Sequence, residues 1–302
     1  MLKTMNKTAL VIETDLGGDP DDLFTLLWLY SLGLNIKAIL ISPGYRHQCA
    51  LARFIISTLH KGTYIGSARY GENKGELSGF YKDLLNKYGG SFEDEADGPG
   101  DEVFLHALWR SNQVAFLGIG PLPNLRMAWN KNSEVMRERI ACATMQGGFL
   151  PYNLYRPTVC LDKFEGKHSV PTFNLNGDVK GAQILIDGLT CPKRFVSKNV
   201  CHTMVYDADI HQRMMTVTPR NEAHLVMIEA LNIYMQRHPD KKFHDPLAAA
   251  CHLWPEIATW FQGVPRREKG GWTVDPSDSD QTLVIADVNR ELFWNLIIEG
   301  EA

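Results

Sequence analysis

The segment of residues 9–30 constrains the fold of this chain more than any other. A short apolar run is followed by a turn rich in carboxylates, glycines and proline, and then by a second apolar run at 23–30. This order predicts a buried strand, a tight turn and a buried helix. We expect Asp19 to cap the helix and Pro20 to be its first residue. The carboxylates of this acidic turn are Asp15, Asp19, Asp21 and Asp22.

Acidic residues at the start of a helix need no ligand, because each interacts favourably with the helix dipole by about 0.3–1 kcal/mol. That explanation fits Asp19 and Asp21 but not Asp15, which would lie at the end of the strand and face the others. Several anions beside a buried strand repel one another unless they are protonated or share a cation. The turn therefore predicts a hard-cation site. An EF-hand is excluded, because Pro20 occupies its glycine position and Leu26 its bidentate glutamate position.

Apolar and amphipathic runs alternate along the rest of the chain. Further strands are predicted at 36–41, 63–65, 114–118, 140–145, 195–200 and 282–287. Further helices are predicted at 48–59, 81–88, 103–109, 122–129, 179–186, 220–236, 246–253 and 291–298. This alternation predicts an α/β fold: a single domain over 1–302 with a mostly parallel, open, Rossmann-like sheet flanked by helices. The segments 67–101 and 149–171 are expected to be surface excursions.

Composition limits the partners and the compartment. The chain is 44% apolar with a formal net charge of −4 and has no basic stripe, so we expect no nucleic-acid partner. The N-terminal residues lack the apolar core of a signal peptide, and no apolar run reaches the roughly 18 residues of a membrane span. The six cysteines are widely spaced without a CxxC pair, which predicts reduced thiols in a cytoplasmic protein and argues against zinc.

Three loops are expected at the carboxyl ends of strands, where open α/β sheets bind ligands. They are the acidic turn, the glycine-rich segment 118–121 and the segment 243–247. In the last, Asp245 and Pro246 have the order of an N-cap and a first helical residue. Capping alone could explain Asp245, but it does not explain His244, because a helix start needs no histidine.

Together these loops resemble motifs of the inosine–uridine nucleoside hydrolase family. The acidic turn is similar to the DxDPGxDDA motif of the family, with two additional residues. Residues 119–124 resemble its TGPLTN segment, 145–148 its MGG strand end with one residue inserted, and 172–178 its EFN segment. The family's HDPLA motif is present unchanged at 244–248. The matches follow the family order over essentially the whole chain.

The resemblance implies a calcium ion and a set of residues around it. Its ligands would be Asp15, Asp22, Asp245 and the main-chain oxygen of Ile119. Asp15 would also activate the attacking water, and His244 would lie near the departing base. The family tends to form dimers or tetramers, so a homodimer or homotetramer is implied as well.

The sugar side of the implied site departs from the family pattern. By resemblance, Asp21 would accept a hydrogen bond from a ribose hydroxyl, and Asn174 would contact the sugar. Thr172 stands where the family has a ribose-binding glutamate, and Tyr45 stands where it has an asparagine. Asn153, in the long segment 149–171, could replace a sugar-binding asparagine.

The predicted activity is cleavage of the N-glycosidic bond of a nucleoside or a related ribosyl compound. Such cleavage forms an oxocarbenium-like sugar and needs a positioned water and a stabilised leaving group. Two alternatives stay open: a nucleoside- or sugar-binding protein with little turnover, and a hydrolase of another sugar conjugate. The segment 149–171 is expected to form a lid or base pocket, with Tyr152, Tyr155 and Phe164 stacking on the base.

Overall fold

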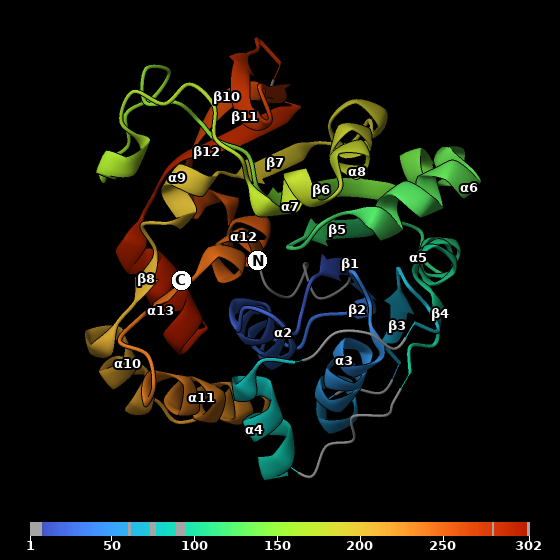
Figure 1. Cartoon of the computed structure of the whole chain (residues 1–302), viewed down its shortest axis with the longest axis vertical. Coiled ribbons are helices and arrows are strands. Elements are labelled where there is room, and N and C mark those ends of the chain that lie inside the picture. The colour runs from blue at the N-terminus through green and yellow to red at the C-terminus, as the bar shows by residue number, and fades with distance from the viewer. Residues whose placement is uncertain (1–7, 60–61, 73–76, 89–94, 280, 301–302) are drawn as a thin grey trace.

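A central ten-stranded sheet organises the molecule (Figure 1). The computed structural model describes residues 8–59, 62–72, 77–88, 95–279 and 281–300. The strand order is β11-β10-β12-β7-β6-β5-β1-β2-β3-β4. Pairing is parallel throughout, except that β10 runs antiparallel to β11 and β12. The predicted fold class, a mostly parallel sheet flanked by helices, is therefore confirmed.

The strands alternate with helices along most of the chain, as the sequence predicts. The strand bounds are β1 Ala9–Thr14, β2 Ile36–Ile41, β3 Tyr64–Ser67, β4 Gly98–Pro99, β5 Val114–Gly118, β6 Ile140–Gln146, β7 Lys193–Val196, β10 Ala258–Glu268, β11 Gly271–Pro276 and β12 Thr282–Val288. The short strands β8 (Val205–Tyr206) and β9 (Lys241–Lys242) form a separate pair.

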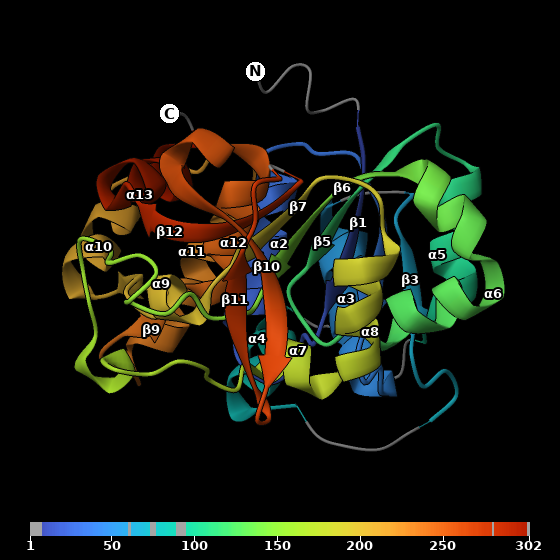
Figure 2. The same ribbon diagram turned by 90° about the horizontal axis from the view of Figure 1, so that it is seen from above.

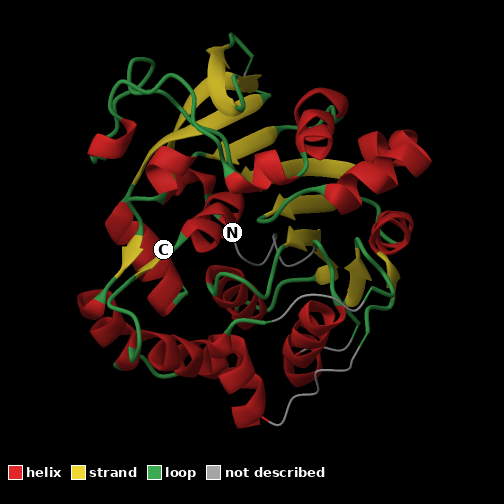
Figure 3. Ribbon diagram, viewed as in Figure 1, coloured by secondary structure: helices red, strands yellow, loops and turns green. Residues whose placement is uncertain are grey.

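Helices cover both faces of the sheet (Figure 3). One face packs on α2 (Asp21–Ser31), α3 (Arg46–Leu59), α4 (Gly79–Tyr88), α11 (Glu222–Met235), α12 (His244–Leu253) and α13 (Arg290–Glu299). The opposite face packs on α5 (Gly100–Trp109), α6 (Pro123–Arg139) and α8 (Val179–Gln183). Side chains of β1 alternate between these two cores: Leu10 and Ile12 belong to the first, and Ala9 and Val11 to the second. A strand buried on both faces explains the continuous apolar run.

The chain reverses its direction of travel across the sheet at β1. From β1 it proceeds outward through β2, β3 and β4, and it then returns to the other side of β1 to lay down β5, β6 and β7. The carboxyl ends of β1 and β5 therefore lie at a topological switch point, where the connections leave a crevice. Both the acidic turn and the segment 118–121 begin there.

The starts predicted for the helices after the acidic turn and after Phe243 are wrong. Helix α2 begins at Asp21, with Pro20 just outside it and no side chain capping it. Helix α12 begins at His244, so Asp245 lies inside its first turn instead of capping it. The cap of α12 comes from elsewhere: the Asp21 carboxylate accepts the main-chain N–H groups of His244 and Asp245 at 3.2 and 3.4 Å.

Several other boundaries also differ. The predicted strand 195–200 ends at Val196, and its remaining residues form the short helix α9 (Lys198–Cys201). The predicted helix 122–129 continues to Arg139, with non-helical backbone at Asn132. The hairpin of β10 and β11 and the helix α10 (Ala208–Met215) were not predicted. The predicted helix 179–186 comprises α8 and the first residues of a π-helical turn, Ile184–Gly188.

The two predicted surface excursions behave differently. The first, 67–101, is not superficial throughout, because α4 buries Tyr81, Leu84 and Leu85 completely in the core. Its residues 73–76 and 89–94 lie outside the described part of the chain. The second, 149–171, is irregular apart from the 3₁₀ turn η1 (Asp162–Phe164) and extends outward past α9 (Figure 1). Among the described residues, no helix is long and apolar enough to cross a membrane.

Candidate active site

Three carboxylates converge at the carboxyl-end edge of the sheet. Asp21 and Asp22 open α2, and Asp245 lies in the first turn of α12. One oxygen from each lies within 4.8 Å of the others, and all three residues are buried. Helices α2 and α12 lie side by side in both views (Figures 1 and 2). Tertiary packing thus brings together acids that are more than 220 positions apart.

Burial and mutual repulsion raise the pKa values of these acids. Burial is the largest cause for Asp22 and Asp245, whose pKa values lie well above the ordinary range, and neighbouring carboxylates add to the effect. Asp22 also accepts a short hydrogen bond from the Thr14 hydroxyl. Such acids resist ionisation together unless a cation neutralises them.

Asp15 lies at the end of β1, beside this group. It is half-buried, and burial together with Asp21 and Asp19 raises its pKa to about 7. The close approach of Gly120 holds it in place: a Cβ atom on Gly120 would lie 2.5 Å from the Asp15 nitrogen. Ile119, the neighbouring residue, donates its N–H to the Glu13 carbonyl at 2.8 Å. The two predicted ligands Asp15 and Ile119 therefore belong to loops that contact each other.

One buried cation from the chain itself faces the acids. The Lys241 ammonium lies 2.7 Å from an Asp19 oxygen and 3.3 Å from an Asp21 oxygen. Burial by itself lowers the pKa of Lys241, but Asp21 and Asp19 together raise it above its ordinary value. Among the described residues, Lys241 is the one cation that forms ion pairs with these acids, so the carboxyl groups of Asp15, Asp19, Asp21, Asp22 and Asp245 outnumber the positive charge beside them.

Asn174 contacts the Ile119 loop and the end of β6. It is buried at the start of α7 (Phe173–Gly177). Its amide donates to the Ile119 carbonyl at 3.1 Å and to the Gln146 side-chain oxygen at 2.7 Å. The Ile119 carbonyl, predicted as a metal ligand, thus also accepts a hydrogen bond, which its two lone pairs allow.

His244 presents an unused nitrogen at the site. Its ring is 23% exposed, yet its Nε2 atom is buried without a hydrogen-bond partner among the described residues. Its Nδ1 lies 4.0 Å from an Asp21 oxygen. Burial, followed by the charge of Lys241, lowers the pKa of His244 to about 3. Beside it stands His202, with ring centroids 4.6 Å apart.

Comparison with known proteins agrees with this geometry. A sequence model of the inosine-uridine preferring nucleoside hydrolase family matches residues 10–295. The chain belongs to this family. It is therefore an enzyme of the nucleoside hydrolase class, as the resemblance of its motifs implies. No curated protein sequence matches it significantly.

Solved structures share the fold at low sequence identity. A plant nucleoside hydrolase superposes with a TM-score of 0.74 and 18% identity, covering 97% of this chain and 98% of its own. A purine-preferring ribonucleoside hydrolase from Gardnerella vaginalis gives 0.69 and 14%, covering 96% and 97%. The inosine-uridine preferring nucleoside hydrolase from Bacillus anthracis gives 0.68 and 16%, covering 97% and 98%.

The residues present fit a hard metal ion. The candidate donors are carboxylate and carbonyl oxygens, which are the ligands that Ca²⁺ and Mg²⁺ prefer. Burial and mutual repulsion disfavour the ionised forms of Asp22 and Asp245, and a bound cation would offset both effects. The acidic group can therefore hold a metal.

The sugar-side departures from the nucleoside hydrolase pattern lie on three separate segments of the chain. Thr172 is buried just before α7, and its hydroxyl accepts the Gly148 N–H at 3.5 Å. Tyr45 is half-buried after β2, with the Arg69 guanidinium 5.5 Å from the centre of its ring. Asn153 is exposed in a turn of the 149–171 segment.

The predicted stacking role of aromatic residues in 149–171 is wrong for two of the three. Tyr152 and Phe164 are buried with Phe149 in a small separate core, so their faces are not free for a base. The Tyr152 hydroxyl accepts the Leu161 N–H at 2.9 Å and ties the segment to itself. Tyr155 is half-buried and packs against the second main core.

Three residues of the site were not predicted from the sequence. They are Gln146, His202 and Lys241. Gln146 is the residue inserted into the MGG-like strand end, so that insertion was a usable signal. Nothing in the local sequence marks His202 or Lys241.

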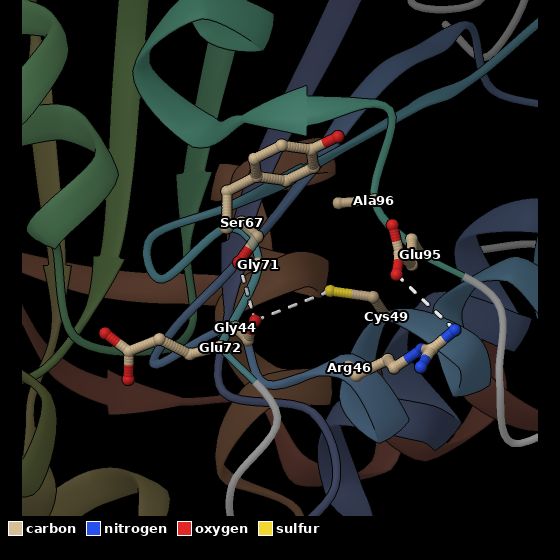
Figure 4. A pocket seen from close by; sticks show the side chains of 9 residues that line it. Gly44, Arg46, Cys49, Ser67, Gly71, Glu72, Glu95 and Ala96 are labelled. Carbon is tan, nitrogen blue, oxygen red and sulfur yellow. Dashed lines mark hydrogen bonds and ion pairs between the residues drawn. The ribbon is translucent and has the colours of Figure 1, made fainter.

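A small cavity near Tyr45 is not part of this site. It measures about 60 Å³ and lies between the loops after β2 and β3 (Figure 4). The Arg46–Glu95 ion pair and the hydrogen bonds from Cys49 and Ser67 to the Gly44 carbonyl cross it. None of the acids of the site lines it, and its volume falls well below the roughly 300 Å³ of a small-molecule pocket.

Proposed function

We propose that this protein is a calcium-dependent N-glycosyl hydrolase that cleaves the N-glycosidic bond of a nucleoside or a related ribosyl compound. The observation that carries the proposal is the buried group of Asp21, Asp22 and Asp245 beside His244. It lies at the switch point of a nucleoside hydrolase sheet. A binding protein would have no need of an acid-rich centre next to an unpartnered imidazole nitrogen.

The proposed ligands of calcium are Asp15, Asp22, Asp245 and the carbonyl oxygen of Ile119. Calcium, when bound, supplies positive charge that orients sugar hydroxyls and makes a water molecule more acidic. Asp21 lies within reach of the same centre and has a second duty, since it accepts the N–H groups at the start of α12.

The chain's own groups would divide the remaining work. Asp15 is half-buried at the open end of β1, so its carboxylate is placed to take a proton from the attacking water. Asn174 and Asp21 offer an amide and a carboxylate to the sugar hydroxyls. His244 offers an N–H to the departing base.

The residues expected to bind the sugar differ from the family pattern, so compounds other than plain ribonucleosides should also be tested as substrates. Thr172 replaces a carboxylate with a neutral hydroxyl, and Tyr45 places an aromatic ring where an amide is usual. Both changes reduce hydrogen-bonding capacity toward a ribose. Asn153 is proposed as a compensating contact, and a different sugar conjugate is the alternative substrate class.

Two further properties are proposed, a reducing compartment and a homo-oligomeric state. All six cysteines lie in described residues and are free thiols, which supports a reducing compartment such as the cytoplasm. A homodimer or homotetramer is proposed from the habit of the family, and light scattering of the purified protein tests it.

Release of free base and reducing sugar from a panel of purine and pyrimidine nucleosides, with calcium present, tests the activity. Because burial lowers the pKa of His244 to about 3, the ring must take up a proton in the substrate complex before it can act as a general acid. In that role, His244→Ala should lower turnover of these substrates by roughly 10²–10⁴-fold. A nitrophenyl riboside, whose leaving group needs no proton, should retain most of its rate. His168→Ala is the matched control, because this histidine is exposed on the 149–171 segment.

The outcomes separate the candidate functions. Sugar binding without base release across the panel would support the binding-protein alternative. Release from another sugar conjugate but from no nucleoside would support the third hypothesis. An equal loss on the nitrophenyl riboside would show that His244 is structural.

A further inference from the structure

A chain of contacts links the long 149–171 segment to His244. The Lys163 ammonium, in the turn η1, lies 2.9 Å from Nδ1 of His202. The edge of Phe164 meets the same imidazole, with ring centroids 5.7 Å apart and an interplanar angle of 85°. The His202 ring also lies against His244, with ring centroids 4.6 Å apart and an interplanar angle of 34°. His202 therefore contacts both the segment and His244.

The anchor on the segment side is rigid. Phe164 is only 4% exposed, and its ring centroid lies 5.4 Å from that of Phe149. The Phe164 and Glu165 N–H groups close the turn on the carbonyls of Leu161 and Asp162, at 2.9 and 3.0 Å. A buried aromatic fixed by its own turn makes a firm wall for the imidazole that it touches.

The contact with Lys163 also selects the tautomer of His202. A lysine ammonium can only donate, so Nδ1 must be the accepting nitrogen and the ring proton must reside on Nε2. Burial, followed by the charges of His244 and Lys163, lowers the pKa of His202 to about 2. A ring that stays neutral can pack against a second imidazole without charge repulsion.

His244 is constrained on the far side as well. Its main-chain N–H is held by Asp21 at 3.2 Å, and its Nε2 is buried without a partner among the described residues. An unpartnered buried nitrogen is costly unless a ligand uses it. The direction in which that nitrogen points depends on the ring plane, and His202 is the group that packs against this plane.

We infer that His202 is a positioning residue that fixes the ring plane of His244 toward the departing base, and that the 149–171 segment sets this geometry through Lys163 and Phe164. The inference rests on the proposed function. It assigns the segment a role different from base stacking. Through His202, the segment orients the residue that faces the leaving group.

Steady-state kinetics of a small variant set test the inference. Misplacing a catalytic group by about 1 Å can cost roughly 100-fold in rate, so we expect His202→Ala to lower kcat on nucleosides tenfold or more. The Michaelis constant and the rate on a nitrophenyl riboside should stay within about twofold of wild type. His202→Phe should recover most of kcat, because it restores the packed ring. Lys163→Met should give an intermediate loss, and His168→Ala is the control on the same segment.

Three kinetic results would overturn the inference. One is an unchanged kcat in His202→Ala. The second is an equal loss on the nitrophenyl riboside, which would indicate general damage. The third is a His202→Phe variant no better than His202→Ala.

Nuclear magnetic resonance tests the same inference without any activity. Long-range proton–nitrogen spectra of the histidine rings should show Nδ1 of His202 unprotonated at neutral pH. The His244 ring signals should shift and average in His202→Ala. A protonated Nδ1 in the wild type, or unmoved His244 signals in the variant, would refute the positioning role. If the wild-type protein does not cleave nucleosides at all, that result would refute the proposed function but not the contact geometry of the two histidines.

Discussion

The acidic turn and the segment 118–121 can pack together only because Gly120 has no Cβ atom. Gly120 approaches the acidic turn so closely that an added Cβ would lie 2.5 Å from the Asp15 nitrogen and 2.7 Å from the Thr14 carbonyl carbon. Both are main-chain atoms, which cannot move aside as a flexible side chain would. The absence of a side chain at residue 120 is therefore a condition for the geometry of Asp15.

Gly120→Ala should destabilise the protein by about 1–3 kcal/mol, the usual cost of overpacking. It should also weaken calcium binding, because the acidic turn must retreat from the Ile119 loop. Chemical denaturation and calorimetry measure the two effects. Gly18→Ala is the matched control, since nothing lies within 4 Å of its added Cβ. Equal stability of both variants would contradict the packing argument.

At the scale of secondary-structure elements, distant carboxylates cap two helices. Glu13 in β1 accepts the N–H groups of Asn124 and Leu125 at 2.8 and 3.1 Å, at the start of α6. Asp21 in α2 serves α12 in the same way. Each carboxylate satisfies main-chain donors that the local sequence leaves unpaired. These hydrogen bonds attach the start of α6 to β1 and the start of α12 to α2, the two elements that carry the acidic turn.

Helix α12 also contains a buried histidine whose protonation should lower the free energy of unfolding in acid. His252 is buried, with Nδ1 2.8 Å from the Thr144 hydroxyl, and burial followed by Arg194 lowers its pKa to about 4. In the unfolded chain its pKa returns to roughly 6.5. The neutral form therefore contributes stability that is complete above pH 6.5 and is lost as the pH falls through 4.

Replacing His252 with asparagine, which keeps a polar partner for Thr144, should flatten this pH dependence. Between pH 7 and pH 4 the wild type should lose roughly 3 kcal/mol more of its unfolding free energy than the variant does. Denaturant titrations at both pH values measure the difference. The exposed His168→Asn variant should behave like the wild type, and parallel losses in wild type and His252→Asn would disprove the assignment.

For the whole molecule, the acidic group concentrates unfavourable charge where several elements meet. The strand β1 and the helices α2 and α12 all contribute carboxylates, and only Lys241 opposes them among the contacts described above. A cation that bound here would stabilise the assembled sheet and its helices together, because the ligands are adjacent only in the folded state.

Added calcium should therefore raise the melting temperature. At a calcium concentration 100 times the dissociation constant, mass action stabilises the folded state by about 2.7 kcal/mol. For a chain of this size that corresponds to roughly 4 °C. Asp22→Asn should abolish most of the shift, and the exposed Asp187→Asn variant should retain it. A wild-type melting temperature that does not change up to millimolar calcium would refute the metal assignment.

The sequence alone determined the features that depend on neighbours along the chain. The apolar runs predicted the parallel strands, because a strand buried on both faces must be apolar throughout. The strand β5 and the strand β2 lie where they were predicted, at 114–118 and 36–41. The motif order also identified the family, and the acidic turn and the segment 118–121 follow strands of the main sheet as predicted. The segment 243–247 does not, because it follows β9 of the separate two-stranded pair.

Which groups from distant parts of the chain meet could be seen in the folded structure alone. The cap of α12 comes from Asp21, so a local reading of Asp245 and Pro246 misplaced its first residue. The rings of Tyr152 and Phe164 are buried in their own small core, because aromatic faces pack wherever the chain folds back on itself. His202 and Lys241 reach the site through packing against His244 and the acidic turn. Sequence spacing carries no information about such contacts, since they depend on side-chain packing and charge between elements far apart in the chain.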